Sequence, residues 1–408
     1  MKILHIAPGG TTCGIATYTA NLIKYFSDAP EHFHELYPIP PKSELSNLSK
    51  AEMLIWAKEL VDKCEGYDFI HLQNEFGLFA GPGGMRLSLN VFFNILNDII
   101  LKGHKLAVTF HSEPTFLKAM GALNFENKKC ARIWKKTAKL FTKKNNCTAI
   151  LHTPLSENVF KESGFKNTCV ITHGVLERSF DKLCQLDQKP TKEGKLTPRL
   201  SLAKGLERYV LIDLHNKDIW ETAVHQDSVV LSLFGYINDY KGHEFALSIL
   251  ELLPSNFKLS IIGGRHPESS REEIGRLLGV ATEMGLVDRV LITGWVTPQE
   301  ADFHQQNADI CLAPYQTQEL SASGAITWSL TSQKPVIASN VNAFRAINRE
   351  SQCMLLCHPH DRLEWVWAIK KVLNDIPFRK RLLNNATKYC KHHSWTNICK
   401  QHMELYKR

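Results

Sequence analysis

A glycine-rich turn near the start of the sequence has the chemistry of an anion site. Gly9, Gly10 and Gly14 lie between a strand-like run, residues 3–7, and a helical segment. Glycines let the backbone approach a ligand, and the amino end of a helix offers free amides. The spacing differs from G-x-G-x-x-G, and no acidic residue near position 30 ends a clear second strand. The pattern disfavours a dinucleotide-binding dehydrogenase.

Polar side chains also follow two later strand-like runs. His111 ends the run 105–110, and His71, Asn74 and Glu75 end the run that begins at Phe69. Carboxyl ends of parallel strands form the ligand-binding edge of α/β sheets, so we expect these side chains to face one ligand site. The alternative is that they are ordinary hydrogen-bonded loop residues.

A serine-rich turn, Ser321–Ala325, precedes a helical run through Trp328. Ser is a good helix N-cap, and the first turn of a helix leaves several amides unpaired at the positive end of its dipole. We expect this turn to hold phosphate groups through backbone amides. Capping alone is the alternative.

Metal sites are disfavoured. The eleven cysteines are an odd number without framework spacing, which favours reduced thiols. No D-x-D triplet occurs. Two groups of potential zinc ligands lie in strand-like or helical runs and give no ligand motif: Cys353, Cys357, His358 and His360; and Cys390, His392, His393 and Cys399.

Composition places the chain among soluble globular proteins. Its 408 residues indicate two or three domains, and hydrophobic residues make up 44% and charged residues 22%. No run approaches the ~18 apolar residues that span a bilayer, and no secretory signal is seen at the start. We therefore expect a cytoplasmic protein.

A basic segment accounts for part of the net charge of +8. Residues 127–156 contain no Asp or Glu, and Lys128–Lys144 carries eight basic residues on a pattern of helical amphipathicity. Such a face could contact anionic lipid at the inner face of a membrane. A solvated surface helix is the other interpretation, and the helix lacks a nucleic-acid-binding signature.

Two series of alternating strands and helices predict an α/β protein with parallel sheets. We expect domains at 1–180 and 229–376, an interdomain connection with an insertion at 181–228, and a helical tail at 377–408. The expected strands are 3–7, 69–72, 105–110, 149–152 and 170–172 in the first series, and 229–234, 258–262, 289–292, 309–313, 335–338 and 354–356 in the second, with a further one at 208–214 in the connection.

Motifs over most of the chain resemble glycosyltransferase family 4. In order, they are Gly9-Gly10 with Asn21-Leu22, Phe69-Ile70-His71-Leu72-Gln73, Thr109-Phe110-His111-Ser112, Leu155-Ser156-Glu157, His173-Gly174-Val175, Leu233-Phe234-Gly235-Tyr236 to Lys241-Gly242, Ile261-Ile262-Gly263-Gly264, Gly294-Trp295-Val296, Ala308-Asp309 to Pro314-Tyr315, Gly324 to Lys334-Pro335, and His393-Ser394-Trp395 with Tyr406. The resemblance implies GT-B architecture, with two Rossmann-like domains facing across a cleft and the C-terminal helix returning to the N-terminal domain.

The resemblance also implies roles for individual residues. Lys241 would contact the diphosphate of a nucleotide-sugar donor, and His111 would reach the donor sugar. Together they form the implied catalytic pair. The implied donor-binding residues are Gly10, Tyr236, Lys241, Gly264, Arg265, Val296, Ser321, Ser323, Gly324 and Ala325. The implied acceptor-binding residues are Gly9, Gly14, His71, Asn74, Glu75 and His173.

Two positions depart from the family pattern. Tyr236 stands where the family usually has an arginine, and Glu319 has no acidic partner at Thr327. The first departure removes a cation expected beside the donor phosphates, and the second puts the expected recognition of the ribose in question.

The sequence therefore predicts a retaining, metal-independent glycosyltransferase without a cofactor. It would move sugar from a nucleoside-diphosphate sugar to a glycan, lipid-linked or small-molecule acceptor. The alternative is a catalytically impaired GT-B protein that binds a ligand or partner. The motifs do not distinguish the sugar, the base or the acceptor.

Overall fold

The computed structural model describes residues 1–10, 13–26, 32–79, 84–115, 125–143, 146–177, 227–265, 273–318, 320 and 322–408. The chain forms two compact units, which are described separately. Unit 1 contains Met1–Gly174, Glu319–Gly324 and His393–Arg408, and unit 2 contains Val175–Gln318 and Ala325–His392.

Unit 1 is built on a parallel six-stranded sheet in the order β2-β1-β3-β4-β5-β6. The strands are β1 (Lys2–Pro8), β2 (Phe33–Ile39), β3 (Phe69–Asn74), β4 (Lys105–Phe110), β5 (Cys147–Leu151) and β6 (Thr168–Val170). β3 and β4 are almost wholly buried, as expected for central parallel strands covered on both faces. β1 lies between β2 and β3, so the strand order reverses beside it.

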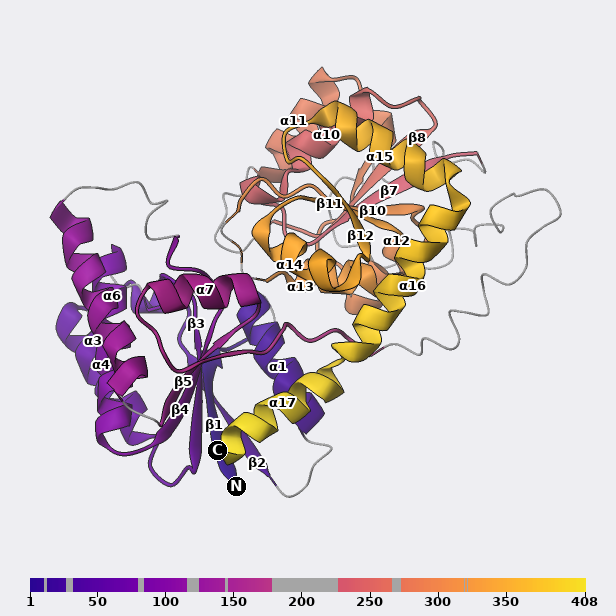
Figure 1. The fold of residues 1–408 in the computed structure, drawn as a ribbon. Coiled ribbons are helices and arrows are strands. Elements are labelled where there is room, and N and C mark those ends of the chain that lie inside the picture. Colours follow the sequence, from indigo (N-terminus) through magenta and orange to yellow (C-terminus); the bar gives the residue numbers. More distant parts are fainter. Residues whose placement is uncertain are drawn as a thin grey trace. The chain divides into compact units, whose positions relative to one another are not determined.

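Helices cover both faces of this sheet, with α3, α4 and α6 on one side and α1 and α17 on the other (Figure 1). The helices of unit 1 are α1 (Gly14–Phe26), α2 (Lys42–Leu45), α3 (Lys50–Asp62), α4 (Gly84–Leu101), α6 (Phe125–Lys143), α7 (Pro154–Glu162) and α17 (Trp395–Lys407). Ser49 and Glu52 form a capping box at the start of α3, and Thr153 caps α7.

An aromatic cluster anchors α6 and α7 to the unit 1 sheet. The Phe110 ring on β4 lies 6.0 Å from Trp134 of α6 and 4.7 Å from Phe160 of α7, measured between ring centroids. Trp134 and Phe160 are buried, whereas Lys135 and Lys139 on the opposite side of α6 are exposed. The amphipathic basic helix predicted from the sequence is therefore present.

Unit 2 repeats the same architecture, with strand order β12-β11-β10-β7-β8-β9. Its strands are β7 (Val229–Phe234), β8 (Phe257–Ile262), β9 (Val290–Ile292), β10 (Ile310–Ala313), β11 (Val336–Ser339) and β12 (Met354–Cys357). Its helices are α10 (His243–Glu251), α11 (Glu273–Glu283), α12 (Pro298–Gln306), α13 (Gly324–Leu330, whose first residue is grouped with unit 1), α14 (Asn342–Ser351), α15 (Arg362–Asn374) and α16 (Ile376–His392), with 3-10 turns η3 (Asp239–Lys241) and η4 (Val287–Arg289).

The predicted α/β class with two parallel sheets is confirmed. One strand was missed, because β2 is an edge strand whose side chains are mostly exposed and so lack a run of apolar residues. The strand expected at 170–172 lies at Thr168–Val170. The strand expected at 208–214, and most of the 181–228 connection, lie outside the described residues.

The predicted tail, 377–408, divides between the two units. α16 belongs to unit 2, and α17 belongs to unit 1, where it packs against α1. Ser394 starts α17 as its N-cap, accepting a hydrogen bond from the Asn397 amide. Within the described part of the chain, no helix is both long and apolar enough to cross a membrane.

Candidate functional site

The carboxyl ends of β7 and β10 form the centre of the candidate site in unit 2. β7 lies between β8 and β10, and because the chain runs from β7 to β8 and β9 before it crosses to β10, the strand order reverses beside β7. Ligands of open α/β sheets bind at such a reversal. The segment Gly235–Gly242 follows β7, and Pro314–Gln316 follows β10.

Lys241 is the buried cation of this site. Its side chain is 5% exposed, and its ammonium nitrogen lies 5.3 Å from the Tyr315 ring centroid. No hydrogen-bond acceptor or carboxylate among the described residues partners the ammonium group. Burial lowers the pKa of Lys241 because it penalises the charged form. Within the described part of the chain, this cation therefore has no counter-charge.

Two glycines make this arrangement possible. Gly235 has φ +117°, and a Cβ there would collide with the Lys241 ammonium. Gly242 has φ +74°, and a Cβ there would collide with the Pro314 carbonyl oxygen. Gln316 ties the two loops together, because its backbone amide donates to the Tyr240 carbonyl over 2.7 Å. The two glycines therefore leave the space that lets Lys241 take this buried position.

The predicted donor-binding residues Tyr236, Gly264, Arg265 and Val296 lie on the neighbouring loops. The Tyr236 ring meets Trp295 edge to face, with centroids 5.0 Å apart. Gly264 makes room for Trp295, because a Cβ there would lie 2.6 Å from the indole. Arg265 pairs through its backbone with Ile237, and Val296 is half-buried directly after Trp295. The structure brings these residues to one edge of the sheet.

Ala325 also belongs to this edge, since its Cβ lies 3.3 Å from the position of a Cβ on Gly235. Ser321 lies outside the described residues. Ser323 is half-buried, and Gly324 begins α13. A Cβ on Gly324 would lie 3.5 Å from His173 Nε2, and both residues are grouped with unit 1.

The glycine turn of unit 1 follows β1, where the strand order reverses. Gly10 has φ +86°, Gly9 lies close to Pro38, and Gly14 opens α1. Residues 11 and 12 lie outside the described part of the chain. The three glycines therefore stand at the edge where the sequence predicted them.

His111 lies at the end of β4, and both of its ring nitrogens face other side chains. Nε2 is 2.8 Å from the Gln73 side-chain amide, and Nδ1 is 3.4 Å from His152 Nε2. The Tyr18 ring packs edge-on against His111, with centroids 5.1 Å apart. Burial, with His152 and His173 nearby, lowers the pKa of His111. The imidazole is therefore neutral at pH 7.

His71 lies deeper than expected for an acceptor-binding residue, because its side chain is fully buried. Its Nε2 is 2.7 Å from Thr109 Oγ1, and its Nδ1 is 2.7 Å from the Tyr406 hydroxyl. Asn74 is also buried and its carbonyl accepts from the His111 amide over 2.9 Å, whereas Glu75 is exposed. Contact of His71 with a ligand would be indirect.

His173 follows β6 and is half-buried. Its Nδ1 lies 2.8 Å from the Gly174 carbonyl, and burial lowers its pKa to about 4. A Cβ on Gly174 would collide with the Trp395 indole of α17, which explains the small residue.

Several residues of this region were not selected from the sequence. We call the following set the histidine network: Tyr18, His71, Gln73, Thr109, His111, His152, His402 and Tyr406. His71 and His111 were selected; a pair of polar residues two positions apart in or at the end of a buried strand, as in His71 with Gln73 and Thr109 with His111, is the signal that could have added Gln73 and Thr109. The α17 members gave no local signal.

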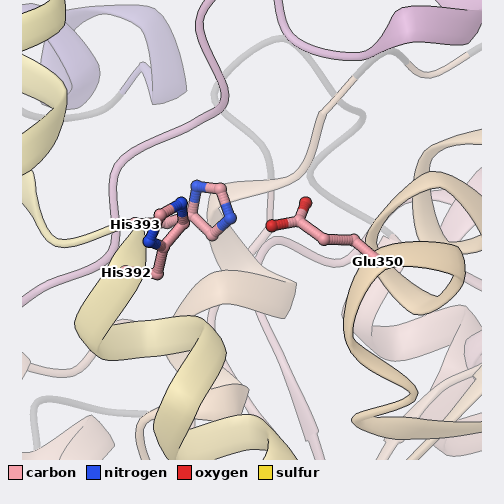
Figure 2. Close-up of side chains that lie close together, drawn as sticks. All are labelled: Glu350, His392 and His393. Atoms are coloured by element: carbon pink, nitrogen blue, oxygen red, sulfur yellow. The ribbon is translucent and has the colours of Figure 1, made fainter.

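One group of three potential metal ligands occurs among the described residues: Glu350, His392 and His393 (Figure 2). Glu350 and His392 are exposed in unit 2, whereas His393 belongs to unit 1, where its Nδ1 lies 2.7 Å from Thr172 Oγ1. The group is divided between the units and carries no metal assignment.

The two Rossmann-like units define the GT-B class of fold. Residues 228–375 match the family described as Glycosyl transferases group 1, which covers most of unit 2 and includes Lys241. The chain is thus related to the GT-B glycosyltransferases, as its motifs predicted.

Curated relatives match part of the chain. An uncharacterized glycosyltransferase of Methanocaldococcus jannaschii is 25% identical over 189 residues, or 45% of this chain and 46% of the relative. The D-inositol 3-phosphate glycosyltransferase of a Nocardioides species is 26% identical over 201 residues, or 45% of this chain and 42% of the relative. The chain thus matches less than half the length of these two relatives.

Solved structures match the whole chain in fold. The Anabaena protein HepE, crystallised with UDP and glucose, has a TM-score of 0.67 at 15% identity and covers 100% of this chain and 99% of its own. Sucrose-phosphate synthase from Thermosynechococcus elongatus also has a TM-score of 0.67, at 18% identity, with coverage of 100% and 98%.

Proposed function

We propose that the protein is a glycosyltransferase that uses a nucleoside-diphosphate sugar. The observation that carries the proposal is Lys241, a buried ammonium group with no anionic partner among the described residues. An unpaired buried charge is costly, and a bound diphosphate would supply the missing counter-charge. The match of residues 228–375 to glycosyltransferases supports the same ligand class.

The chemistry follows from the charge of the leaving group. As the glycosidic bond breaks, negative charge grows on the departing diphosphate, and a fixed cation stabilises it more in the transition state than in the ground state. Lys241 would supply that cation. The lack of a D-x-D triplet supports metal independence, and retention of anomeric configuration rests on the resemblance to family 4.

Unit 1 would bind the uncharged groups of the substrates, namely the donor sugar and the acceptor. Neutral imidazoles and amides suit the hydroxyl groups of a sugar, and His111 would contact the donor sugar. The acceptor would meet the loops that carry Gly9, Gly14 and His173. UDP-glucose is the first donor to test, because the structurally similar HepE was crystallised with UDP and glucose.

Backbone amides at the start of α13 would assist Lys241 and offset the cation missing at Tyr236. Gly324→Val tests this assignment, because the larger side chain obstructs close approach of phosphate while removing no polar group. We expect donor affinity to fall at least as much as in Lys241→Ala. A folded variant that binds UDP as well as the wild type would contradict it.

The exposed lysines of α6 would bring the enzyme to an acceptor carried by an anionic membrane. Sedimentation with liposomes containing anionic lipid should show binding that salt weakens and that charge reversal at Lys135, Lys136 and Lys139 abolishes. Absence of sedimentation at low salt would leave α6 as a solvated helix.

The activity itself is tested by nucleotide release from UDP-sugars and GDP-sugars with a panel of acceptors in excess EDTA. Product NMR then gives the anomeric configuration. We expect release in EDTA and a retained anomer. Complete dependence on a divalent ion, or an inverted product, would contradict those parts of the proposal. Tight nucleotide binding without transfer would favour the impaired GT-B alternative.

A further inference from the structure

The histidine network joins α17 to His111 through a continuous series of contacts. The Tyr18 hydroxyl lies 3.1 Å from His402 Nε2, and His402 Nδ1 lies 3.5 Å from the Tyr406 hydroxyl. Tyr406 contacts His71 Nδ1 over 2.7 Å. The Gln73 carboxamide then lies between His71 and His111, with one terminal atom 3.2 Å from His71 Nε2 and the other 2.8 Å from His111 Nε2.

The far end of the network can hold its proton in one way only. His152 Nδ1 lies 3.1 Å from the Ile171 carbonyl oxygen, which is an acceptor, so Nδ1 carries the proton. Burial lowers the pKa of His152 to about 3, so the ring is neutral and its Nε2 is an acceptor. The contact between His152 Nε2 and His111 Nδ1 is then a hydrogen bond only if His111 Nδ1 donates.

The proton on His111 Nδ1 also fixes which atom of the Gln73 side chain must face His111. A neutral His111 with a proton on Nδ1 has a lone pair on Nε2, and its partner on Gln73 must donate. As placed, Gln73 turns Oε1 toward His111 and Nε2 toward His71. A half-turn of the carboxamide exchanges two atoms of similar size and costs no packing.

The half-turn also satisfies the rest of the network. His71 Nε2 then donates to Thr109 Oγ1 and to Gln73 Oε1, so His71 Nδ1 accepts from the Tyr406 hydroxyl. Tyr406 in turn accepts from His402 Nδ1, and His402 Nε2 accepts from the Tyr18 hydroxyl. Every neutral group donates once along the series, and no two lone pairs face each other. The opposite orientation places two lone pairs between His111 and His152.

We propose that Gln73 is a positioning residue that holds His111 in the tautomer with its proton on Nδ1, by donating its amide N–H to His111 Nε2. The one N–H of neutral His111 is then engaged with His152 and its lone pair with Gln73, so the ring is fixed in place and is not a general base. The catalytic consequence rests on the proposed function, in which the positioned His111 ring contacts the donor sugar. The tautomer itself does not depend on any activity.

The tautomer can be measured by NMR on full-length protein labelled with 15N in histidine, without substrate. Couplings between ring nitrogens and ring carbon-bound protons distinguish the two neutral tautomers, and the His111→Gln spectrum assigns the His111 signals. We expect His111 at pH 7 to be protonated on Nδ1 alone. A proton on Nε2, or an imidazolium, would overturn the proposal.

Gln73→Glu provides the second test, because a carboxylate only accepts and would require a proton on His111 Nε2. We expect the His111 tautomer to switch or the ring to become charged. Gln73→Met, which fills similar volume, should give a mixture of tautomers and serves if the Glu variant does not fold. Unchanged spectra in the folded Gln73 variants would exclude a positioning role. Gln305→Met, a buried glutamine of α12 in unit 2, is the matched control and should leave the His111 signals unchanged.

Kinetics separate this inference from the proposed function. In Gln73→Met we expect kcat to fall about tenfold, the rate equivalent of one net hydrogen bond, with KM for the donor little changed. A KM effect with normal kcat would contradict a role at the reacting sugar. Absence of any transfer by the wild type would overturn the proposed function and leave the tautomer result standing.

Discussion

Both units are built on a parallel six-stranded sheet, in different strand orders, but they bury different chemistry beneath the carboxyl ends of their strands. In unit 1, neutral imidazoles, hydroxyls and an amide hydrogen-bond to one another, as the contact of His71 with Tyr406 illustrates. In unit 2, the carboxyl-end edge holds glycines around the Lys241 ammonium, which has no anionic partner among the described residues. The fold therefore sets where a ligand binds, whereas the local side chains decide whether that ligand is neutral or anionic.

The largest expected difference between the units is in their response to acid. Burial lowers the pKa of His152 and His402 to about 3, so these groups take up protons only when unit 1 unfolds. Below the ordinary histidine pKa of ~6.5, the unfolded chain binds more protons, and each group removes about 1.4 kcal/mol of stability per pH unit. Between pH 6.5 and 5 these two histidines together remove roughly 3 kcal/mol, because the unfolded imidazole is only half-protonated at pH 6.5. His5, His71 and His111 are shifted in the same direction.

Hydrogen exchange at pH 7 and pH 5, corrected for the intrinsic rates, would measure this difference. We expect the amides of β3, β4 and β5 to lose protection before those of β7, β8 and β10. Among the described histidines of unit 2, burial lowers the pKa of His243 and His304, so unit 2 should follow at lower pH. Loss of protection in unit 2 first would break the comparison.

The second effect concerns anion binding by unit 2. Lys241→Ala should weaken UDP binding by about 1.5–3 kcal/mol, the range for a hydrogen bond to a charged group. Calorimetric titration measures the change. Lys258→Ala is the matched control, because Lys258 is a buried lysine at the amino end of β8 and donates to the Asp288 carbonyl. Equal losses in the two variants would place the anion elsewhere.

The third effect concerns the hydrogen bonds of unit 1. Tyr406→Phe leaves buried nitrogens of His71 and His402 without their hydroxyl partner, and we expect a loss of about 1–3 kcal/mol in the free energy of unfolding. Tyr67→Phe removes a hydroxyl whose partner, Glu35, stays in water, so it should cost less. Urea unfolding compares the two variants. Similar losses would show that the network does not depend on this hydroxyl.

Much of the fold could be predicted because its strands are apolar and buried on both faces. The runs at Lys105–Phe110 and Val229–Phe234 stand out from polar surroundings, and both are strands in the structure. β2 escaped because an exposed edge strand does not need apolar side chains. The prediction of the first sheet therefore lacked its edge strand β2.

The candidate site was predictable only where chain neighbours define it. Gly235, Lys241 and Gly242 lie within eight residues, so their association can be read from the motif. By contrast, His71 meets Tyr406 across a separation of 335 residues. Nothing in a local pattern shows that a helix 300 residues later fills the space beside β3. The depth of His71 could not be read from its place near the end of a strand.

The return of α17 to unit 1 has a consequence for synthesis on the ribosome. Domains generally fold in the order in which they emerge, the N-terminal one first. Unit 1 emerges first but cannot close its interior, since His71 and Tyr18 must wait for His402 and Tyr406. Unit 2 does not depend on residues translated later, because all of its strands and helices end by His392. The unit translated first is thus the one completed last.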